Sequence, residues 1–230
     1  MNAPLTTEEL ESLRRLNAST LANAIEQFHQ RTRNEGFIKN SIHCLFPDLP
    51  TVAGYAATVK VRGSAPPTVG SYSDRTDWWD YILSIPAPRL VVVQDVGTTP
   101  GIGSLLGAVH VNILRALGCV GAVTNGAVRD LPEAKQLGFQ LFSEKLSVSH
   151  AYIHIVDFGN PVQIGGLEIN SGDLLHGDLH GLQSIPLDIA TKVPAVAAEI
   201  AAREQELISL CQSRDFSLEK LRAAISQERH

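Results

Sequence analysis

The sequence has few cysteines and no long apolar run, and both absences restrict what the chain can be. Its 230 residues include only three cysteines, Cys44, Cys119 and Cys211, without close spacing. An odd number at such spacing argues against a disulfide framework and against a zinc knuckle. No apolar stretch reaches the ~20 residues that a membrane-spanning helix needs. We therefore expect neither a disulfide-rich protein nor a membrane protein.

Basic residues are too few and too scattered to indicate a nucleic-acid partner. Lysines and arginines number 19 against 24 aspartates and glutamates, which gives a formal net charge of −5. A negative balance gives no support to binding of a polyanion. The first five residues lack the basic region and apolar run of a signal peptide. The sequence therefore predicts a cytoplasmic protein that binds neither nucleic acid nor a membrane.

The apolar pattern predicts one α/β domain with a mixed central β-sheet and flanking N- and C-terminal helices. Hydrophobic residues make up 44% of the chain, which is ordinary for a globular domain. Because there is no internal repeat and no low-complexity linker, we expect residues 1–230 to form a single domain with a core over about 16–190. Strands are predicted at 54–62, 90–93, 120–124, 139–142, 151–156, 167–169 and 182–185.

Helices are expected on both sides of this β-rich core. Apolar spacing and capping residues predict them at 6–30 in two pieces, 74–83, 104–117 and 194–226. Thr6 or Thr7 can cap the first piece, and Ser19 can cap the second. Pro194 suits the first turn of the C-terminal helical extension, and Ser217 can cap a last short helix within it.

The segment 90–130 is the part of the chain that indicates a binding site. A buried strand leads into a loop that contains Gly101 and Gly103, and a helix and a second strand follow. Glycines let a backbone approach a ligand closely, and a helix start offers free N–H groups to an anion. The spacing G-x-G-x-x-x-G departs from the dinucleotide fingerprint G-x-G-x-x-G, which disfavours a nucleotide cofactor. A loop that merely turns the chain is the simpler alternative.

Arg129 and Asp130 are adjacent at the predicted end of the second strand. Open α/β sheets often place ligands at that edge. An arginine can form two parallel hydrogen bonds to a carboxylate, and an aspartate can hold a hard divalent cation. The pair therefore indicates a site for a small 2-oxo acid and a metal. Spacing alone gives about equal weight to the alternative, in which both residues make only structural contacts.

The run Gly126-Ala127-Val128-Arg129-Asp130 resembles the RraA-like family. Further matches are Gly165-Gly166-Leu167, Ser171-Gly172-Asp173 and the stretch from Gly177 to Pro186, so the resemblance covers about 16–206. The family includes 4-hydroxy-4-methyl-2-oxoglutarate aldolases, which also decarboxylate oxaloacetate, and a regulator of ribonuclease E activity, which is a binding protein. It implies a homotrimer, or a multiple such as a hexamer, with active sites between subunits.

The aldolase branch of the family implies a class II mechanism that depends on Mg²⁺ or Mn²⁺. Carried onto this sequence, Asp130 would anchor the metal, largely through water, and Arg129 would bind the carboxylate or the developing enolate of the pyruvyl unit. A metal that polarises the C2 carbonyl stabilises the enolate as the carbon–carbon bond breaks. The substrate's carboxylate end would be bound by the backbone of Gly107, Ala108, Val109 and His110.

The sequence also departs from the family's pattern. Ala108 stands where aldolases commonly carry an acidic residue, and Asn125 stands where many members have an acid. A further family acid comes from the C-terminal helix of a neighbouring subunit, and Glu204 matches it best, with Glu206 as the alternative register. His110, whose reference pKa is ~6.5, could replace the missing acid as a proton relay or could be a histidine of the helix surface.

Retention of Asp130 favours an enzyme over the regulator. We therefore expect a metal-dependent lyase that acts on a small 2-oxo acid by retro-aldol cleavage or by decarboxylation of oxaloacetate. The alternatives are a non-catalytic regulatory protein and an enzyme of the same scaffold that acts on a different acid. We expect His150 and His154 to be structural, and Cys119 to be a small buried hydrophobe.

Overall fold

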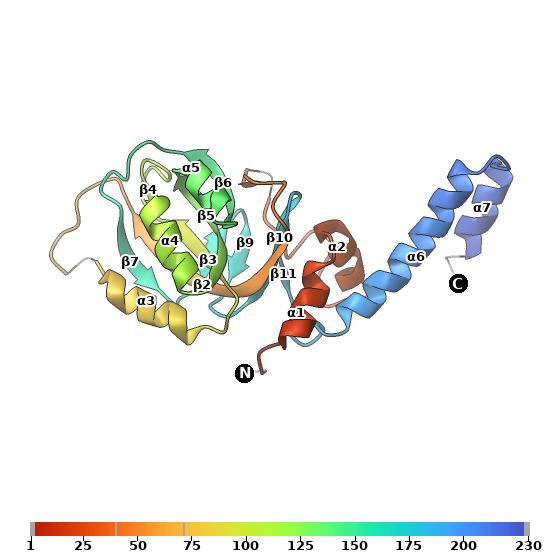
Figure 1. Ribbon diagram of the computed structural model, residues 1–230, viewed down its shortest axis with the longest axis horizontal. Coiled ribbons are helices and arrows are strands. Elements are labelled where there is room, and N and C mark those ends of the chain that lie inside the picture. Colours follow the sequence, from red (N-terminus) through yellow and green to blue (C-terminus); the bar gives the residue numbers. More distant parts are fainter. Residues whose placement is uncertain (1–2, 40, 71, 228–230) are drawn as a thin grey trace.

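The protein is an α/β domain built on one large mixed sheet (Figure 1). The computed structural model describes residues 3–39, 41–70 and 72–227, so the ends of the predicted domain, 1–2 and 228–230, lie outside the described residues. The sheet strands are β1 (His43–Cys44), β2 (Val52–Arg62), β3 (Arg89–Asp95), β4 (Ser104–Leu106), β5 (Cys119–Val128), β6 (Gln140–Leu146), β7 (His154–Phe158), β10 (Leu174–Asp178) and β11 (Gly181–Ile185).

These nine strands of the described chain follow the order β1-β6-β5-β3-β2-β10-β11, with β4 beside β5 and β7 beside β2. The centre of the sheet is parallel, because β2 with β3, β3 with β5, and β5 with β6 all run in the same direction. The edges are antiparallel. A separate hairpin is formed by β8 (Val162–Ile164) and β9 (Leu167–Ile169). The predicted mixed central sheet is confirmed.

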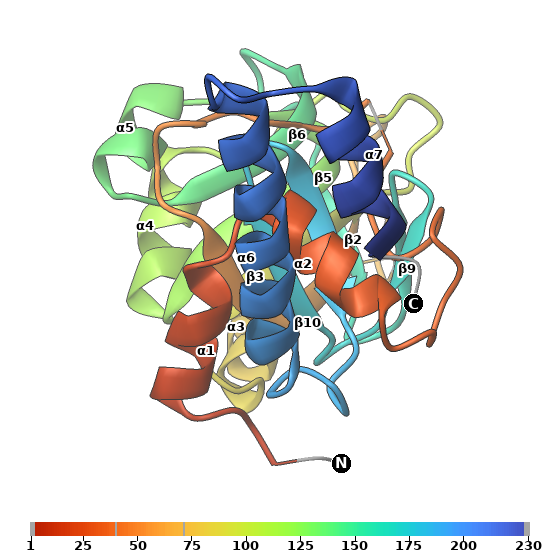
Figure 2. The same ribbon diagram turned by 90° about the vertical axis from the view of Figure 1, so that its right-hand side faces the viewer.

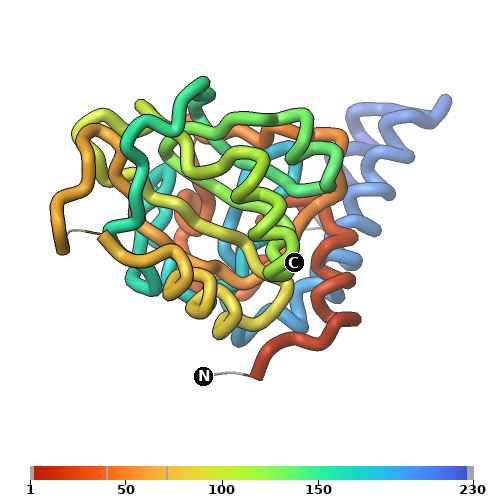
Figure 3. Tube along the Cα trace, turned by 60° about the vertical axis from the view of Figure 1, so that its left-hand side comes forward, coloured from red at the N-terminus to blue at the C-terminus, as the bar shows by residue number. Residues whose placement is uncertain are grey.

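Helices surround this sheet and extend past it. They are α1 (Thr7–Arg14), α2 (Ala18–Glu26), α3 (Arg75–Ser84), α4 (Ala108–Ala116), α5 (Leu131–Gln136), α6 (Val193–Gln212) and α7 (Leu218–Gln227). Figure 2 shows α6 in front of the sheet with α1 and α2 beside it, and Figure 3 shows the C-terminal helices on the same side of the molecule as the N-terminal segment. None of the described helices is long and apolar enough to cross a membrane.

Both faces of the central sheet are buried, which explains the unbroken apolar run in β3. Val91 and Val93 belong to the large core cluster that also includes residues of α1 to α4 and α6. Leu90 and Val92 face the opposite way, into a second cluster that includes the β8–β9 hairpin. Parallel strands that are covered on both sides carry continuous rather than alternating hydrophobic residues. The core thus holds the ends of β3 and β5 in fixed positions.

Of the two N-terminal helices, α1 has the predicted N-cap residue and α2 has a different one. Thr6 accepts a hydrogen bond from the backbone N–H of Glu9, whose side chain bonds back to Thr6, and this capping box confirms the first prediction. The prediction of Ser19 as the second cap is wrong. Asn17 caps α2, because its extended backbone places Oδ1 2.8 Å from the N–H of Thr20.

The prediction of a helix from residue 104 is wrong at its start. Ser104–Leu106 form β4, which pairs in parallel with β5 opposite Ala127 and Val128. All three β4 residues are buried, and the Ser104 hydroxyl donates to the carbonyl of Leu106 at 3.0 Å. Helix α4 therefore begins at Ala108 with Gly107 as its N-cap residue. This shift brings the start of α4 next to the end of β5.

The chain after Asp130 was predicted as β-rich, but it first forms α5. Asp130 is the N-cap residue of this helix, and a proline lies in its first turn. A proline fits that turn because its missing N–H would have no partner there. The predicted strands at 139–142, 151–156, 167–169 and 182–185 are found, with shifted ends for all but the third. Strands β1, β8 and β10 were not predicted.

Candidate functional site

A pocket of about 310 Å³ lies where the end of β5 meets the start of α4. Five of the residues predicted for the site line it, namely Gly107, Val109, His110, Arg129 and Asp130. The fold thus brings together the glycine, the helix start and the Arg-Asp pair, which the sequence separates by about 20 positions. Parallel α/β sheets characteristically form ligand sites at such strand ends.

Asp130 links the two elements that form the pocket. Its Oδ2 accepts a hydrogen bond of 2.8 Å from the backbone N–H of Ala108, in the first turn of α4. The backbone of Asp130 is left-handed, with φ +54° and ψ +47°, a conformation that aspartate tolerates better than most residues. Within the described residues no hydrogen bond reaches Oδ1. One carboxylate oxygen is therefore committed to the fold and the other is open to a ligand.

Arg129 holds an unpaired donor beside Asp130. Its Nε is buried and has no hydrogen-bond partner in the described part of the chain. It lies 3.7 Å from Oδ2 of Asp130, which is an ion-pair distance rather than a hydrogen bond. A long bond of 3.4 Å joins another guanidinium nitrogen to the carbonyl of Val148. Because a buried donor without a partner costs free energy, a ligand oxygen that reached Nε after a small movement of the side chain would be stabilised.

The side chains of Arg129 and Asp130 approach the backbone of Gly107 so closely that this position requires a glycine. A Cβ built on it would lie 2.8 Å from Nε of Arg129 and 2.8 Å from Oδ2 of Asp130. Its φ of −122° is open to any residue, so the requirement is space and not backbone conformation. A glycine at this position lets the Arg-Asp pair lie directly against the helix start.

The first turn of α4 supplies two further donors. Among the described residues, no acceptor is within hydrogen-bond range of the backbone N–H groups of Val109 and His110. The N–H of Ala108, predicted to bind substrate, is already bonded to Asp130. Unpaired N–H groups and the helix dipole together favour an anion at this end of the helix.

His110 faces the same pocket as an uncharged ring. Burial, with smaller contributions from the charges of Arg75 and Arg129, lowers the pKa of His110 from 6.5 to about 4. Its Nε2 is buried and has no partner among the described residues. The imidazole is therefore neutral near pH 7 and keeps one ring nitrogen uncommitted, as a proton relay requires. Because the residue is only half-buried, the prediction of a proton relay and that of a helix-surface histidine both stay open.

Sequence reasoning missed two basic residues of the pocket, Arg75 and His150. Arg75 begins α3, and His150 precedes β7, so no local motif connects either with Arg129. With both arginines present, two permanent positive charges face one carboxylate, Asp130, within the lining. The pocket as a whole is thus suited to an anionic ligand.

The acids predicted on the C-terminal helix, and Asn125 at a position where the family often has an acid, lie outside the pocket of the single chain. Glu204 and Glu206 are exposed on α6, which packs against α1, α2 and α7, while α4 contacts β4, β5 and α5 (Figure 1). Asn125 bonds to both backbone groups of Asp95, at 2.7 Å and 3.1 Å, and so joins β5 to β3. Asn125 therefore has a structural role.

A metal would find one protein carboxylate in this pocket. The described residues contain no group of three or more His, Cys, Asp or Glu side chains that could hold a metal ion. The open Oδ1 of Asp130 fits Mg²⁺ or Mn²⁺ that keeps several waters and takes its other ligands from a substrate. It does not fit an ion enclosed entirely by protein ligands.

Comparison with known proteins identifies the family. A model of the RraA-like family, described as Aldolase/RraA, matches residues 19–183. A protein of Halalkalibacterium halodurans, provisionally named a 4-hydroxy-4-methyl-2-oxoglutarate aldolase, is 28% identical over 123 residues. That match spans 51% of this chain and 59% of that protein, so the chain is matched to little more than half of its relative.

Solved structures share the fold. A protein from Pseudomonas syringae pv. tomato superposes with a TM-score of 0.74 at 22% identity, over 96% of this chain and 95% of that one. Streptomyces coelicolor RraAS2, described as an unusual member of the RNase ES inhibitor RraA protein family, gives 0.68 at 20% identity, over 91% and 98%. Because the family model covers most of the sequence and these folds agree, the chain belongs to the RraA-like family.

Proposed function

We propose that this protein is a metal-dependent lyase that acts on a small 2-oxo acid, by retro-aldol cleavage to pyruvate, by decarboxylation of oxaloacetate, or by both. The observation that carries the proposal is the set of unpaired donors around one open carboxylate oxygen. The Nε of Arg129 and the N–H groups of Val109 and His110 lack protein acceptors within the described chain. The name of the Halalkalibacterium relative supports the same reaction class.

In this proposal the 2-oxo acid lies with its carboxylate among these donors. Arg129 supplies a charged N–H, and α4 supplies backbone N–H groups at the positive end of its dipole. A lysine at position 129 would supply a point charge without the planar fork that matches a carboxylate. Arg129 thereby orients the pyruvyl unit toward Asp130.

The proposed cofactor is Mg²⁺ or Mn²⁺, held through the open Oδ1 of Asp130. When bound there, the metal would supply Lewis-acid polarisation of the C2 carbonyl. The hydrogen bond from Ala108 fixes the Asp130 carboxylate in place. The protein's contribution at this point is a rigid, correctly oriented oxygen.

His110 is the proposed proton relay. Because its ring is neutral near pH 7 and its Nε2 is uncommitted, Nε2 can exchange a proton with the substrate hydroxyl or with C3 of the enolate. The proposal also includes a homotrimer or hexamer in which Glu204 of a neighbouring subunit, or Glu206 in the other register, approaches the metal-bound waters. The exposure of both residues on α6, which projects from the core, supports this part.

The test is release of pyruvate from oxaloacetate and from 4-hydroxy-4-methyl-2-oxoglutarate, with Mg²⁺ and with a chelator. We expect release that the chelator abolishes, and a loss of at least about 100-fold in Asp130→Asn, the size expected when a key electrostatic group is removed. Asp215→Asn, an exposed aspartate between α6 and α7, is the matched control and should keep full activity. Release that is unaffected by the chelator or by Asp130→Asn would refute the proposal.

A non-catalytic binding protein is the second candidate, favoured by the lack of a three-ligand metal group in the described chain. It predicts that pyruvate or a related acid binds in an Arg129-dependent manner, while no 2-oxo acid is turned over above background with either metal. The same assay therefore separates the two candidates.

A further inference from the structure

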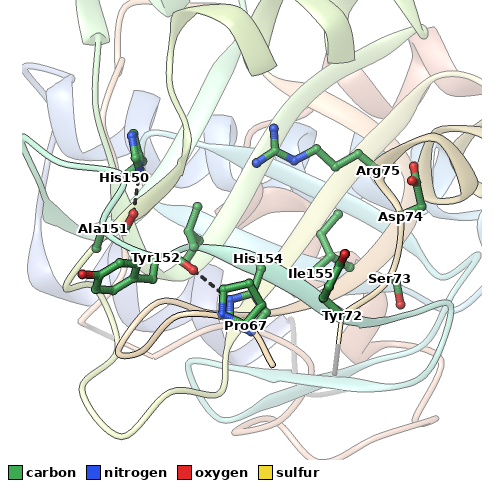
Figure 4. A pocket seen from close by; sticks show the side chains of 11 residues that line it. Pro67, Tyr72, Ser73, Asp74, Arg75, His150, Ala151, Tyr152, His154 and Ile155 are labelled. Carbon is green, nitrogen blue, oxygen red and sulfur yellow. Dashed lines mark hydrogen bonds between the residues drawn. The ribbon is translucent and has the colours of Figure 1, made fainter. Parts of the chain in front are cut away.

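A second pocket, of about 450 Å³, adjoins the first one (Figure 4). Arg75, His150 and Ile153 line both pockets. Figure 4 shows Arg75 reaching across one edge of the second pocket in the direction of His150. Because three side chains are shared, a ligand anchored at Arg129 can extend past Arg75 and His150 into the second pocket.

The second pocket has a mixed lining. Tyr72, Tyr152, Pro67 and Ile155 contribute aromatic and apolar surface, whereas Ser73, Asp74, Arg75 and two histidines contribute polar groups. Each of the two tyrosines is 56% exposed, and neither is paired with another aromatic ring in the described chain. Tyrosine rings present large flat surfaces that a planar group can cover. A lining of this kind suits a ring that carries a polar group better than a short aliphatic acid.

Two histidines of the second pocket have their hydrogen-bonding roles fixed by the backbone. The Nδ1 of His150 lies 2.6 Å from the carbonyl oxygen of Ala151, and the Nδ1 of His154 lies 2.7 Å from that of Tyr152. A carbonyl oxygen can only accept, so each Nδ1 carries the hydrogen. In the neutral ring Nε2 is then an acceptor. Each histidine can thus receive a hydroxyl or N–H of a ligand.

Arg75 stands between the two pockets and is available to a ligand. Its guanidinium forms no hydrogen bond or ion pair with the residues that the structure describes, while its charge acts on the carboxylate of Asp74 and helps to lower the pKa of His110. An arginine can stack on the face of an aromatic ring, or it can bind a carboxylate. The tyrosines beyond it and the carboxylate of Asp74 in the same lining favour the first of these uses.

We infer that the second pocket binds the group carried on C4 of the 2-oxo acid, and that this group is a hydroxylated aromatic ring. The inference rests on the proposed function, which places the oxo acid end at Arg129. In the cleavage, the C3–C4 bond breaks and its electron pair remains on C3. The C4 hydroxyl loses its proton and becomes the carbonyl of an aromatic aldehyde, while C3 gains a proton to give pyruvate. No oxidant or reductant is needed.

The test is titration calorimetry of the full-length protein with Mg²⁺ and four acids that are not cleaved. These are pyruvate, 2-oxoglutarate, 2-oxo-4-phenylbutanoate and 2-oxo-4-(4-hydroxyphenyl)butanoate. We expect the hydroxyphenyl acid to bind at least about tenfold more tightly than pyruvate, which corresponds to about 1.4 kcal/mol. Tyr152→Ala and, independently, Tyr72→Ala should remove that gain while leaving the Kd of pyruvate unchanged. His154→Leu should reduce the advantage of the hydroxyphenyl over the phenyl acid.

The matched control is Phe216→Ala, which removes a 46% exposed aromatic ring between α6 and α7 and should change no affinity. The inference is wrong if the ring-bearing acids bind no better than pyruvate, if 2-oxoglutarate binds best, or if both tyrosine variants keep the gain. These results leave the proposed function intact as long as pyruvate binds. If the ring-bearing acids bind and pyruvate does not bind at all, the proposed 2-oxo acid function is refuted. If none of the four acids binds, the proposed function and the inference about the second pocket are both refuted.

Discussion

The carboxylate of Asp130 is bonded through Oδ2 to the backbone N–H of Ala108, at 2.8 Å. This contact ties the residue that follows β5 to the first turn of α4, across 22 positions of sequence. It also leaves Arg129, 3.7 Å away, with a buried Nε that lacks a partner in the described chain. The same aspartate that would hold the metal therefore fixes the geometry of the pocket.

Substitution by Asn or by Ala distinguishes the effect of the left-handed backbone of Asp130 from the effect of its charge. Asn tolerates φ +54° well, whereas Ala in that region costs about 1–2 kcal/mol. We expect Asp130→Ala to lower the free energy of unfolding by about that much relative to Asp130→Asn, as measured in urea. Pyruvate release should be lost in both variants. Equal stabilities would show that backbone conformation at this residue has no energetic consequence.

The lack of space beside Gly107 predicts that adding one methyl group there strongly reduces activity. In Gly107→Ala the new Cβ would meet Nε of Arg129 and Oδ2 of Asp130, each at 2.8 Å, so the pair must move. We expect pyruvate release to fall about 100-fold, because a displacement of about 1 Å at a reacting centre has this effect. The control is Gly138→Ala, which is strained at φ +63° but has no atom within 4 Å of the new Cβ. It should lose stability yet keep its turnover per folded molecule.

The lowered pKa of His110 predicts a specific loss of stability in acid. The ring has a pKa of about 4 in the folded chain and about 6.5 when unfolded, so between these values the unfolded state binds more protons. Stability from this source is complete above pH 6.5 and falls as the pH falls toward 4. We expect the Tm difference, wild type minus His110→Gln, to be smaller or more negative at pH 5 than at pH 7.5. A difference that does not change with pH would contradict the neutral, buried state.

The three cysteines should differ sharply in reactivity. Burial raises the pKa of Cys119 to about 12, and the residue is fully buried, while Cys211 is exposed on α6. Burial also raises the pKa of the half-buried Cys44. Since the thiolate is the reactive form, a disulfide reagent at pH 8 should label Cys211 first and Cys119 only on unfolding. Loss of the fast phase in Cys211→Ser identifies it, and early labelling of Cys119 would count against the buried strand.

The sequence was sufficient to locate the Arg-Asp pair and the helix beside it, because both follow from local patterns. Two buried apolar runs predict parallel strands, and the end of the second places Arg129 and Asp130 at the sheet edge. The predicted helix start was wrong because β4 is held by pairing with β5, a contact distant in sequence. Ser-Leu-Leu alone gives no sign of this pairing, since leucine is equally suited to a helix.

Contacts distant in sequence also explain why part of the lining was missed. Arg75 and His150 reach the pocket from the start of α3 and the loop before β7, and neither has a spacing that relates it to Arg129. Helix α5 was not predicted, although the sequence contains a signal for it. Pro132, directly after Leu131, suits the first turn of a helix. The role of Glu204 depends on a second subunit, so it stays a prediction.

The most direct test of the account is a crystal structure of the protein with pyruvate and Mg²⁺. We predict that the pyruvate carboxylate lies within hydrogen-bond distance of Arg129 and the N–H groups of Val109 or His110, with the metal held by Oδ1 of Asp130 directly or through its bound water. Pyruvate bound elsewhere, or a metal that Asp130 holds neither directly nor through water, would contradict the account.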